Sequence, residues 1–155
     1  MTIAVVETWV EEPLKRFVGD ARVRLALLLH PSGQVLAQSG FTRAIDVMSA
    51  CALAAAIFAS AGELGKQLEG KPFHVLHHAG KLRQIFIAPA QTPRGLYIFL
   101  TVFDQESSLG LVTLYFGEFA SRLADAAPTA EPNPVVLAEN FERDLNRNLA
   151  SLFGR

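Results

Sequence analysis

Three histidines lie close together in the sequence, at His74, His77 and His78, and they are the first candidates for metal binding. On a β-strand, His74 and His78 would share one face while His77 pointed to the other, so the three side chains cannot easily meet at one ion. Zinc sites also favour cysteine or acidic ligands, and the neighbouring sequence offers none. We therefore predict no metal site here and interpret the three residues as polar or edge-strand histidines.

The segment from Gly62 to Lys66 reads GELGK and is the only stretch with any likeness to a phosphate-binding loop. That motif needs four residues between its glycines and a Ser or Thr after its lysine. Here two residues separate Gly62 from Gly65, and Gln67 follows the lysine. The segment also stands at the end of a predicted helix instead of after a strand. We interpret it as helix termination and predict no bound nucleotide or other cofactor.

Candidate nucleophiles and general bases do not assemble into a recognisable catalytic motif. The sequence contains neither a G-x-S-x-G elbow nor a Cys–His signature. Cys51, the single cysteine, stands among alanines in a predicted helix, where a small buried hydrophobe in a reducing cytosol is the better interpretation. Asp104, Glu106 and Ser108 share one loop, and carboxylates before a helix are more often caps than catalysts. We predict no catalytic residues and a protein that is not an enzyme.

Composition narrows the classes of partner. The 155 residues carry a formal net charge of −1, so no basic surplus is present to neutralise the phosphates of a nucleic acid. The first ten residues, MTIAVVETWV, lack the basic start of a secretory signal. The longest charge-free run, Val47 to Gly62, is shorter than the ~20 residues that span a bilayer. We expect a cytoplasmic protein that neither binds nucleic acid nor inserts into a membrane.

Hydrophobic residues make up 50% of the chain, and the mean hydropathy is +0.26. A small domain has a limited interior, so a surplus of apolar residues indicates surface that another chain covers. The alternative is a monomer rich in Phe and Ala. We favour the interface.

The elements that must carry these residues follow from the hydrophobic pattern. Apolar residues at helical spacing between Val6 and Phe17 predict an amphipathic helix, in which Pro13 either introduces a kink or stands in the first turn of a fresh helix. Arg22 to His30 predicts a strand covered on both faces, and a type I turn at Pro31-Ser32-Gly33 leads into the returning strand Gln34 to Gln38.

A long helix is predicted from about Ala44 to Leu68, with Thr42 or Asp46 as its cap. Three strands follow, and after a loop in which Ser107 or Ser108 caps it, a further helix begins near Leu111. The predicted strands and the connecting turn are Phe73–His78, Lys81–Ala88, a polar turn at Pro89–Arg94, and Gly95–Asp104. This order predicts an α+β fold, with a central antiparallel five-stranded sheet and helices on its faces.

The chain divides into three parts. Residues 1–127 form the predicted domain, residues 128–134 a stiff Pro-rich linker, and residues 135–155 a C-terminal amphipathic helix. A helix on such a tether must dock on its own domain, on a second copy or on a target. The apolar side chains expected to dock are Phe141, Leu145, Leu149 and Leu152.

The chain resembles the Roadblock/dynein-light-chain superfamily, and within it the bacterial MglB-type proteins. The specific stretch is Phe103–Ala124, FDQESSLGLVTLYFGEFASRLA, where an aliphatic strand ends in Phe-Asp and a short loop leads through Leu-Gly into a helix. The first hairpin, Leu25–Ala37, the Ala-rich middle helix and the helix beyond the linker also match. Members often carry a basic residue after the Leu-Gly pair, whereas Leu111 follows here, which leaves the exact partner open.

The resemblance implies a homodimer, in which edge strands join into one sheet and the middle helices pack side by side. The edge strand would be Phe73–His78, because an edge of that kind is a liability unless it is paired. The residues expected at this dimer or partner interface are Ala52, Ala55, Ala59, Gly62, Phe73, Val75 and His77. For each small helix residue, tight packing on the chain's own sheet is an equal alternative.

MglB-like proteins act on a small Ras-like GTPase, typically as activating partners in cell polarity and gliding motility. The resemblance therefore implies a non-enzymatic scaffold that stimulates GTP hydrolysis or modulates nucleotide exchange without its own arginine finger. Two alternatives share the fold and stay open, because fold alone does not decide function. One is a sensor that binds a small molecule between sheet and helix, and the other is a purely structural adaptor.

Overall fold

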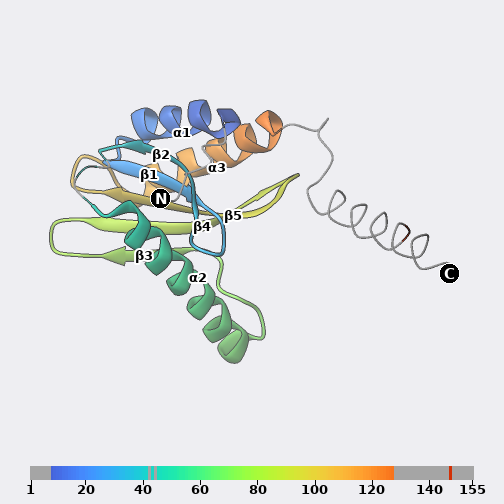
Figure 1. Cartoon of the computed structure of the whole chain (residues 1–155). Helices are drawn as coiled ribbons and strands as arrows, with labels where there is room; N and C mark the ends of the chain where they lie inside the picture. The colour runs from blue at the N-terminus through green and yellow to red at the C-terminus, as the bar shows by residue number, and fades with distance from the viewer. Residues whose placement is uncertain (1–7, 42, 44, 128–146, 148–155) are drawn as a thin grey trace.

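The computed structural model describes residues 8–41, 43, 45–127 and 147. It is an α+β fold in which helices cover both faces of one five-stranded antiparallel sheet, in the strand order β2-β1-β5-β4-β3 (Figure 1). The elements are α1 (Thr8–Ala21), β1 (Leu25–Leu29), β2 (Val35–Gly40), α2 (Val47–Glu69), β3 (Leu76–Ala79), β4 (Gln84–Thr92), β5 (Gly95–Phe103) and α3 (Leu109–Ala126). The predicted fold class and element order are confirmed.

Helices α1 and α3 lie side by side on one face of the sheet (Figure 1). Phe17 of α1 packs edge-on against Phe99 of β5, with ring centroids 4.9 Å apart, and Phe119 of α3 completes the group. All three side chains are fully buried. Aromatic residues bury large areas each, so this cluster anchors the two helices to the sheet.

Helix α2 lies on the opposite face, where it packs on a second apolar cluster. Leu25, Leu27 and Leu29 of β1 point toward α2, whereas Ala26 and Leu28 point toward α1 and α3. All five residues of β1 are buried, because the strand is central and helices cover both of its faces. This is the double burial that the unbroken apolar run predicts.

Two helix starts confirm predicted caps. Asp46 accepts a hydrogen bond from the backbone N–H of Ser49 at the start of α2, and Ser108 accepts one from Leu111 at the start of α3. Helix α1 already begins at Thr8 and contains Pro13 in its interior, so no fresh helix starts at the proline. The type I turn is consistent with a hydrogen bond from Gly33 N–H to the His30 carbonyl, at 2.8 Å.

The predicted polar turn at Pro89–Arg94 is wrong. Strand β4 continues to Thr92, and Pro89 pairs with Ile98 inside the β4–β5 hairpin. Proline cannot donate to a sheet and is therefore confined to edges. Strand β3 covers β4 only from Gln84 to Ile87, so the rest of β4 is itself an edge and tolerates the proline.

Strand β3 is shorter than predicted. It begins at Leu76 instead of Phe73 and ends at Ala79. The residues before it are held by the close packing of segment 71–73 on Gly65 of α2, which keeps them away from β4. The linker at 128–134 and the predicted C-terminal helix, with Phe141, Leu145, Leu149 and Leu152, lie outside the described residues except for Arg147, which is helical.

Candidate interaction surface

Helix α2 is capped at both ends, by Asp46 and by Gly70, and the two caps define the length of the helix. The Asp46 carboxylate accepts hydrogen bonds from Ser49, at 2.7 Å from the hydroxyl and 3.3 Å from the backbone N–H, and these bonds lower its pKa. At the other end Gly70 has φ +80°, and its N–H donates to the Lys66 carbonyl at 3.0 Å. A left-handed residue of this kind favours glycine and ends the helix sharply.

The inward side of α2 consists of small residues that allow a close approach to the sheet. Cys51, Ala54 and Ala55 are buried against the leucines and isoleucines of the central strands. Burial raises the pKa of the Cys51 thiol to about 11, so the thiol stays protonated and unreactive. The prediction of a buried, structural cysteine is confirmed.

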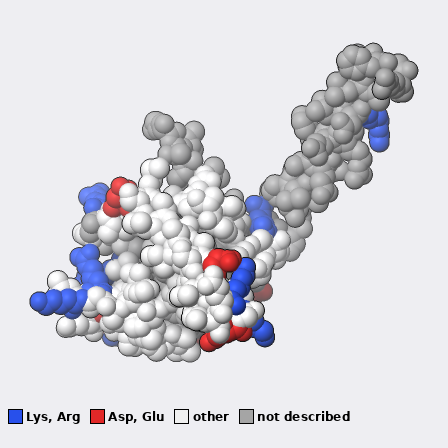
Figure 2. Space-filling view, turned by 90° about the horizontal axis from the view of Figure 1, so that it is seen from below, with Lys and Arg blue, Asp and Glu red and all other residues white. Residues whose placement is uncertain are grey.

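The outward side of α2 exposes several large apolar side chains. Met48, Leu53, Leu64 and Leu68 are each more than half exposed, and Val75, just before β3, is 55% exposed. Figure 2 shows this side of the molecule as a broad area with few charged residues, bordered by Lys, Arg, Asp and Glu on its left and right. Monomeric proteins rarely expose a continuous apolar area of this kind unless it binds something. We call it the α2 face.

The second half of α2 has no buried residue other than Gly65. A Cβ atom on Gly65 would lie 2.7 Å from the Lys71 carbonyl oxygen and closer still to the backbone N of Phe73. The chain returning from α2 to β3 therefore packs directly on the helix backbone here. On the outward side, Ala59, Ser60, Glu63, Leu64 and Gln67 line a shallow hollow of about 460 Å³.

Strand β3 forms one edge of the sheet, and within the described residues only β4 pairs with it. The His77 Nε2 lies 2.7 Å from the Gln84 Oε1, and its ring stacks on Phe103 at 6.1 Å on the α1 and α3 side. His77 therefore borders the edge but faces away from α2. No group of three metal-binding side chains occurs in the described part of the chain.

The structure separates the interface residues that the sequence groups together. Ala52 and Ala59 are exposed on the α2 face, and Gly62 is half-buried beside Pro72. Ala55, by contrast, is 7% exposed and packs on the sheet of its own chain, which is the alternative held open for each small residue. Phe73 is half-buried and Val75 exposed, both ahead of β3.

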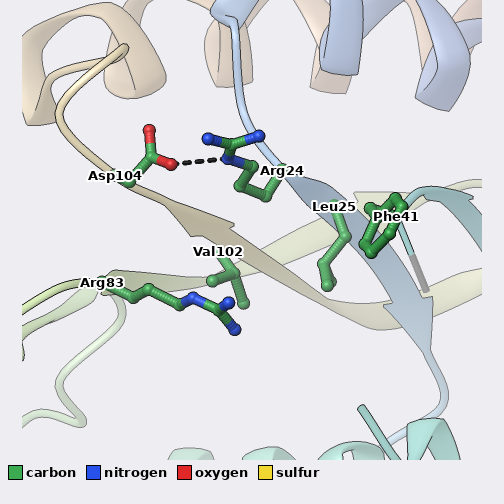
Figure 3. A pocket seen from close by; sticks show the side chains of 6 residues that line it. All are labelled: Arg24, Leu25, Phe41, Arg83, Val102 and Asp104. Carbon is green, nitrogen blue, oxygen red and sulfur yellow. Dashed lines mark hydrogen bonds and ion pairs between the residues drawn. The ribbon is translucent and has the colours of Figure 1, made fainter. Parts of the chain in front are cut away.

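One pocket lies on the α2 side of the sheet and was not predicted (Figure 3). It has a volume of about 270 Å³ and is lined by Arg24, Leu25, Phe41, Arg83, Val102 and Asp104. The Arg24 Nε donates to the Asp104 Oδ2 at 2.5 Å. The lining residues come from four separate parts of the chain, so no local sequence motif predicts the pocket.

Helix α2 is the one helix among the described residues that is long and apolar enough to cross a membrane. It has 23 residues, because it continues beyond the charge-free run Val47–Gly62 and includes Glu63, Lys66 and Glu69. Helices buried in protein interfaces meet the same criterion.

Comparison with known proteins supports the fold on both sequence and structure. Residues 10–103 match the model of the Roadblock/LC7 domain. MglB of Myxococcus xanthus is 25% identical with a TM-score of 0.69, and covers 77% of this chain and 94% of its own. The gliding protein MglB of Thermus thermophilus is 27% identical with a TM-score of 0.67, covering 82% and 93%. An MglB solved in a tetrameric arrangement gives the same values.

A Roadblock/LC7 domain from Streptomyces avermitilis is 16% identical with a TM-score of 0.59, and it supports the fold alone. It covers 75% of this chain and 92% of its own. No curated protein matches the sequence. The family match covers more than half of the chain and agrees with the observed strand order and helix layers. This chain belongs to the Roadblock/LC7 domain family.

Proposed function

We propose that this protein is a non-enzymatic, cytoplasmic homodimer that binds and regulates a small Ras-like GTPase. The observation that carries the proposal is the exposed, largely apolar α2 face. Burying an exposed leucine contributes about 1.5–3 kcal/mol, so covering Leu53, Leu64 and Leu68 would offset much of the entropic cost of association. A second polypeptide is therefore the natural cover.

In the proposed dimer, two α2 helices lie side by side and the β3 edges join the two sheets. Exposed alanines at 52, 56 and 59 support close helix approach, because small side chains let backbones come near each other. The short, open β3 edge supports sheet joining, since its unpaired backbone groups need partners. Both features lie on one side of the molecule, so one two-fold axis can serve both.

The GTPase part of the proposal comes from the likeness to MglB proteins, one of which is described as a gliding protein. A two-fold dimer presents one composite face, which would hold a single GTPase asymmetrically. Regulation would then work by repositioning the GTPase's own switch residues, which is why we assign no catalytic residue to this chain. The segment with Phe141, Leu145, Leu149 and Leu152 would reach the same target and modulate nucleotide exchange.

Two measurements on the full-length protein test the proposal. Light scattering after size exclusion is expected to give twice the 16.8 kDa subunit mass. A small Ras-like GTPase from the same genome is expected to bind, and its rate of GTP hydrolysis or nucleotide exchange is expected to change. A monomer would contradict the dimer. Binding without any change in either rate would favour a purely structural adaptor, and no binding at all would overturn the GTPase assignment.

A further inference from the structure

The pocket between Arg24 and Arg83 lies where four strands end or begin. Arg24 and Leu25 stand at the start of β1, Phe41 follows β2, Arg83 precedes β4, and Val102 and Asp104 close β5. Leu25 and Val102 belong to the apolar cluster on the α2 side of the sheet. The pocket therefore opens on the same side of the molecule as the α2 face.

The two arginines of the pocket differ in how their charge is compensated. Arg24 is paired with Asp104 and is also drawn to Glu106. The Glu106 backbone N–H donates to the Asp104 carboxylate at 3.0 Å, and this bond together with Arg24 lowers the pKa of Asp104. Arg83 has no ion pair within 4.0 Å in the described part of the chain and acts on Asp104 only from a distance. Its guanidinium reaches into the pocket below Val102 (Figure 3).

The remaining walls are apolar. Leu25 and Val102 form the base, and Phe41 is 66% exposed at the rim. A guanidinium beside such walls suits a carboxylate that is attached to an apolar group, because arginine binds carboxylates through paired hydrogen bonds. The volume of about 270 Å³ is below the range of roughly 300–1,000 Å³ for small-ligand pockets, so side chains of a docked protein fit better than a free ligand.

We infer that this pocket receives an acidic side chain and an adjacent apolar side chain from the GTPase that docks on the composite face of the dimer. The carboxylate binds Arg83, and the apolar side chain packs between Phe41, Leu25 and Val102. This inference rests on the proposed function and adds to it a specific anchor outside α2. Charge complementarity at such a site sets which partner is accepted and how fast it associates.

The test is Arg83→Glu in the full-length protein, with Lys81→Glu as the matched control. Lys81 is exposed on the same turn between β3 and β4, carries the same charge and does not line the pocket. Arg83→Glu is expected to weaken binding of this GTPase by roughly ten- to hundred-fold, while Lys81→Glu changes it by less than about threefold. Phe41→Ser is expected to weaken binding as well, because the apolar wall is lost.

Each variant is also measured by light scattering and by circular dichroism. Arg83→Glu is expected to keep the dimer mass and the folded spectrum, because Arg83 is exposed and makes no ion pair in the described residues. Should Arg83→Glu misfold, Arg83→Gln takes its place with a smaller expected loss. If wild-type protein binds the GTPase and Arg83→Glu or Arg83→Gln binds equally well, the pocket inference alone is overturned. If Arg83→Glu no longer forms the dimer, the pocket contributes to the contact with a second copy of this chain, and the inference that it binds the GTPase is overturned. No binding by wild-type protein overturns the proposed function and the inference together.

Discussion

Cys51 illustrates how a single side chain is defined by its surroundings. Its thiol is fully buried between α2 and the sheet, and burial without a nearby base raises its pKa to about 11. A thiol that resists ionisation is a poor nucleophile and a poor metal ligand. The single cysteine of this chain is therefore part of the hydrophobic core and not a reactive site.

The raised pKa makes a prediction about stability at high pH. In the unfolded chain the thiol ionises near its ordinary pKa of 9.0, whereas in the folded protein it stays protonated until about pH 11. The folded state then binds more protons than the unfolded state between these values, so stability falls as the pH rises. We expect wild-type protein to lose roughly 1–3 kcal/mol more than Cys51→Ala between pH 8 and pH 11. Urea unfolding at a series of pH values measures this difference, and parallel curves for the two proteins would contradict it.

The roles of single residues could be predicted from the sequence where they depend on near neighbours in the chain, and not where they depend on distant ones. The caps Asp46 and Ser108 follow from local rules, because a cap bonds to a residue three positions away. The pocket residues do not. Arg24 and Asp104 are separated by 80 positions and meet only because β1 and β5 are neighbours in the sheet.

Helix α2 is the element on which the proposed surface depends, and its second half is positioned by one glycine. A Cβ on Gly65 would collide with the backbone of segment 71–73. Gly117 of α3 is also helical, but a Cβ there would meet nothing within 4 Å. We expect Gly65→Ala to lower the free energy of unfolding by about 1–3 kcal/mol. Gly117→Ala is expected to raise it by roughly 0.5–1 kcal/mol, because alanine is the better helix former. Thermal unfolding of both variants tests this, and a stabilised Gly65→Ala would refute the close packing.

Elements were predictable wherever hydrophobic periodicity decided them. Helix α2 and the doubly buried strand β1 appear close to their expected positions, since their patterns reflect burial directly. The bounds of β3 and β4 were not predictable. They depend on where segment 71–73 packs and on how far β3 reaches along β4, and both are tertiary contacts.

For the whole molecule, the decisive question is what covers the α2 face. Ala55 and Ala59 are one helical turn apart on the same side of α2, yet Ala55 packs on the sheet whereas Ala59 is exposed. Arginine at position 55 buries an unpaired charge inside the fold, so we expect Ala55→Arg to unfold or aggregate. Arginine at position 59 stays in solvent in a single chain, so we expect Ala59→Arg to fold normally but to fail as a dimer or in partner binding.

Circular dichroism separates folding from assembly, and light scattering gives the mass. The expected result for Ala59→Arg is a folded spectrum at the mass of one subunit, or a dimer that no longer binds the GTPase. A folded dimer with unchanged partner affinity would refute the proposed role of the α2 face.

The proline within β4 has a consequence for self-association. Past Ile87 no strand among the described residues pairs with the outer border of β4, and a chain adding there would find no amide at Pro89 to donate to its carbonyl. The proline therefore disfavours the pairing of a further strand along most of that border. The four residues Leu76–Ala79 of β3 remain able to pair with another strand. On this border the sheet can therefore accept a neighbouring strand at Leu76–Ala79 but is poorly suited to pairing along the rest of β4, which would limit edge-to-edge aggregation on the β3 side of the molecule.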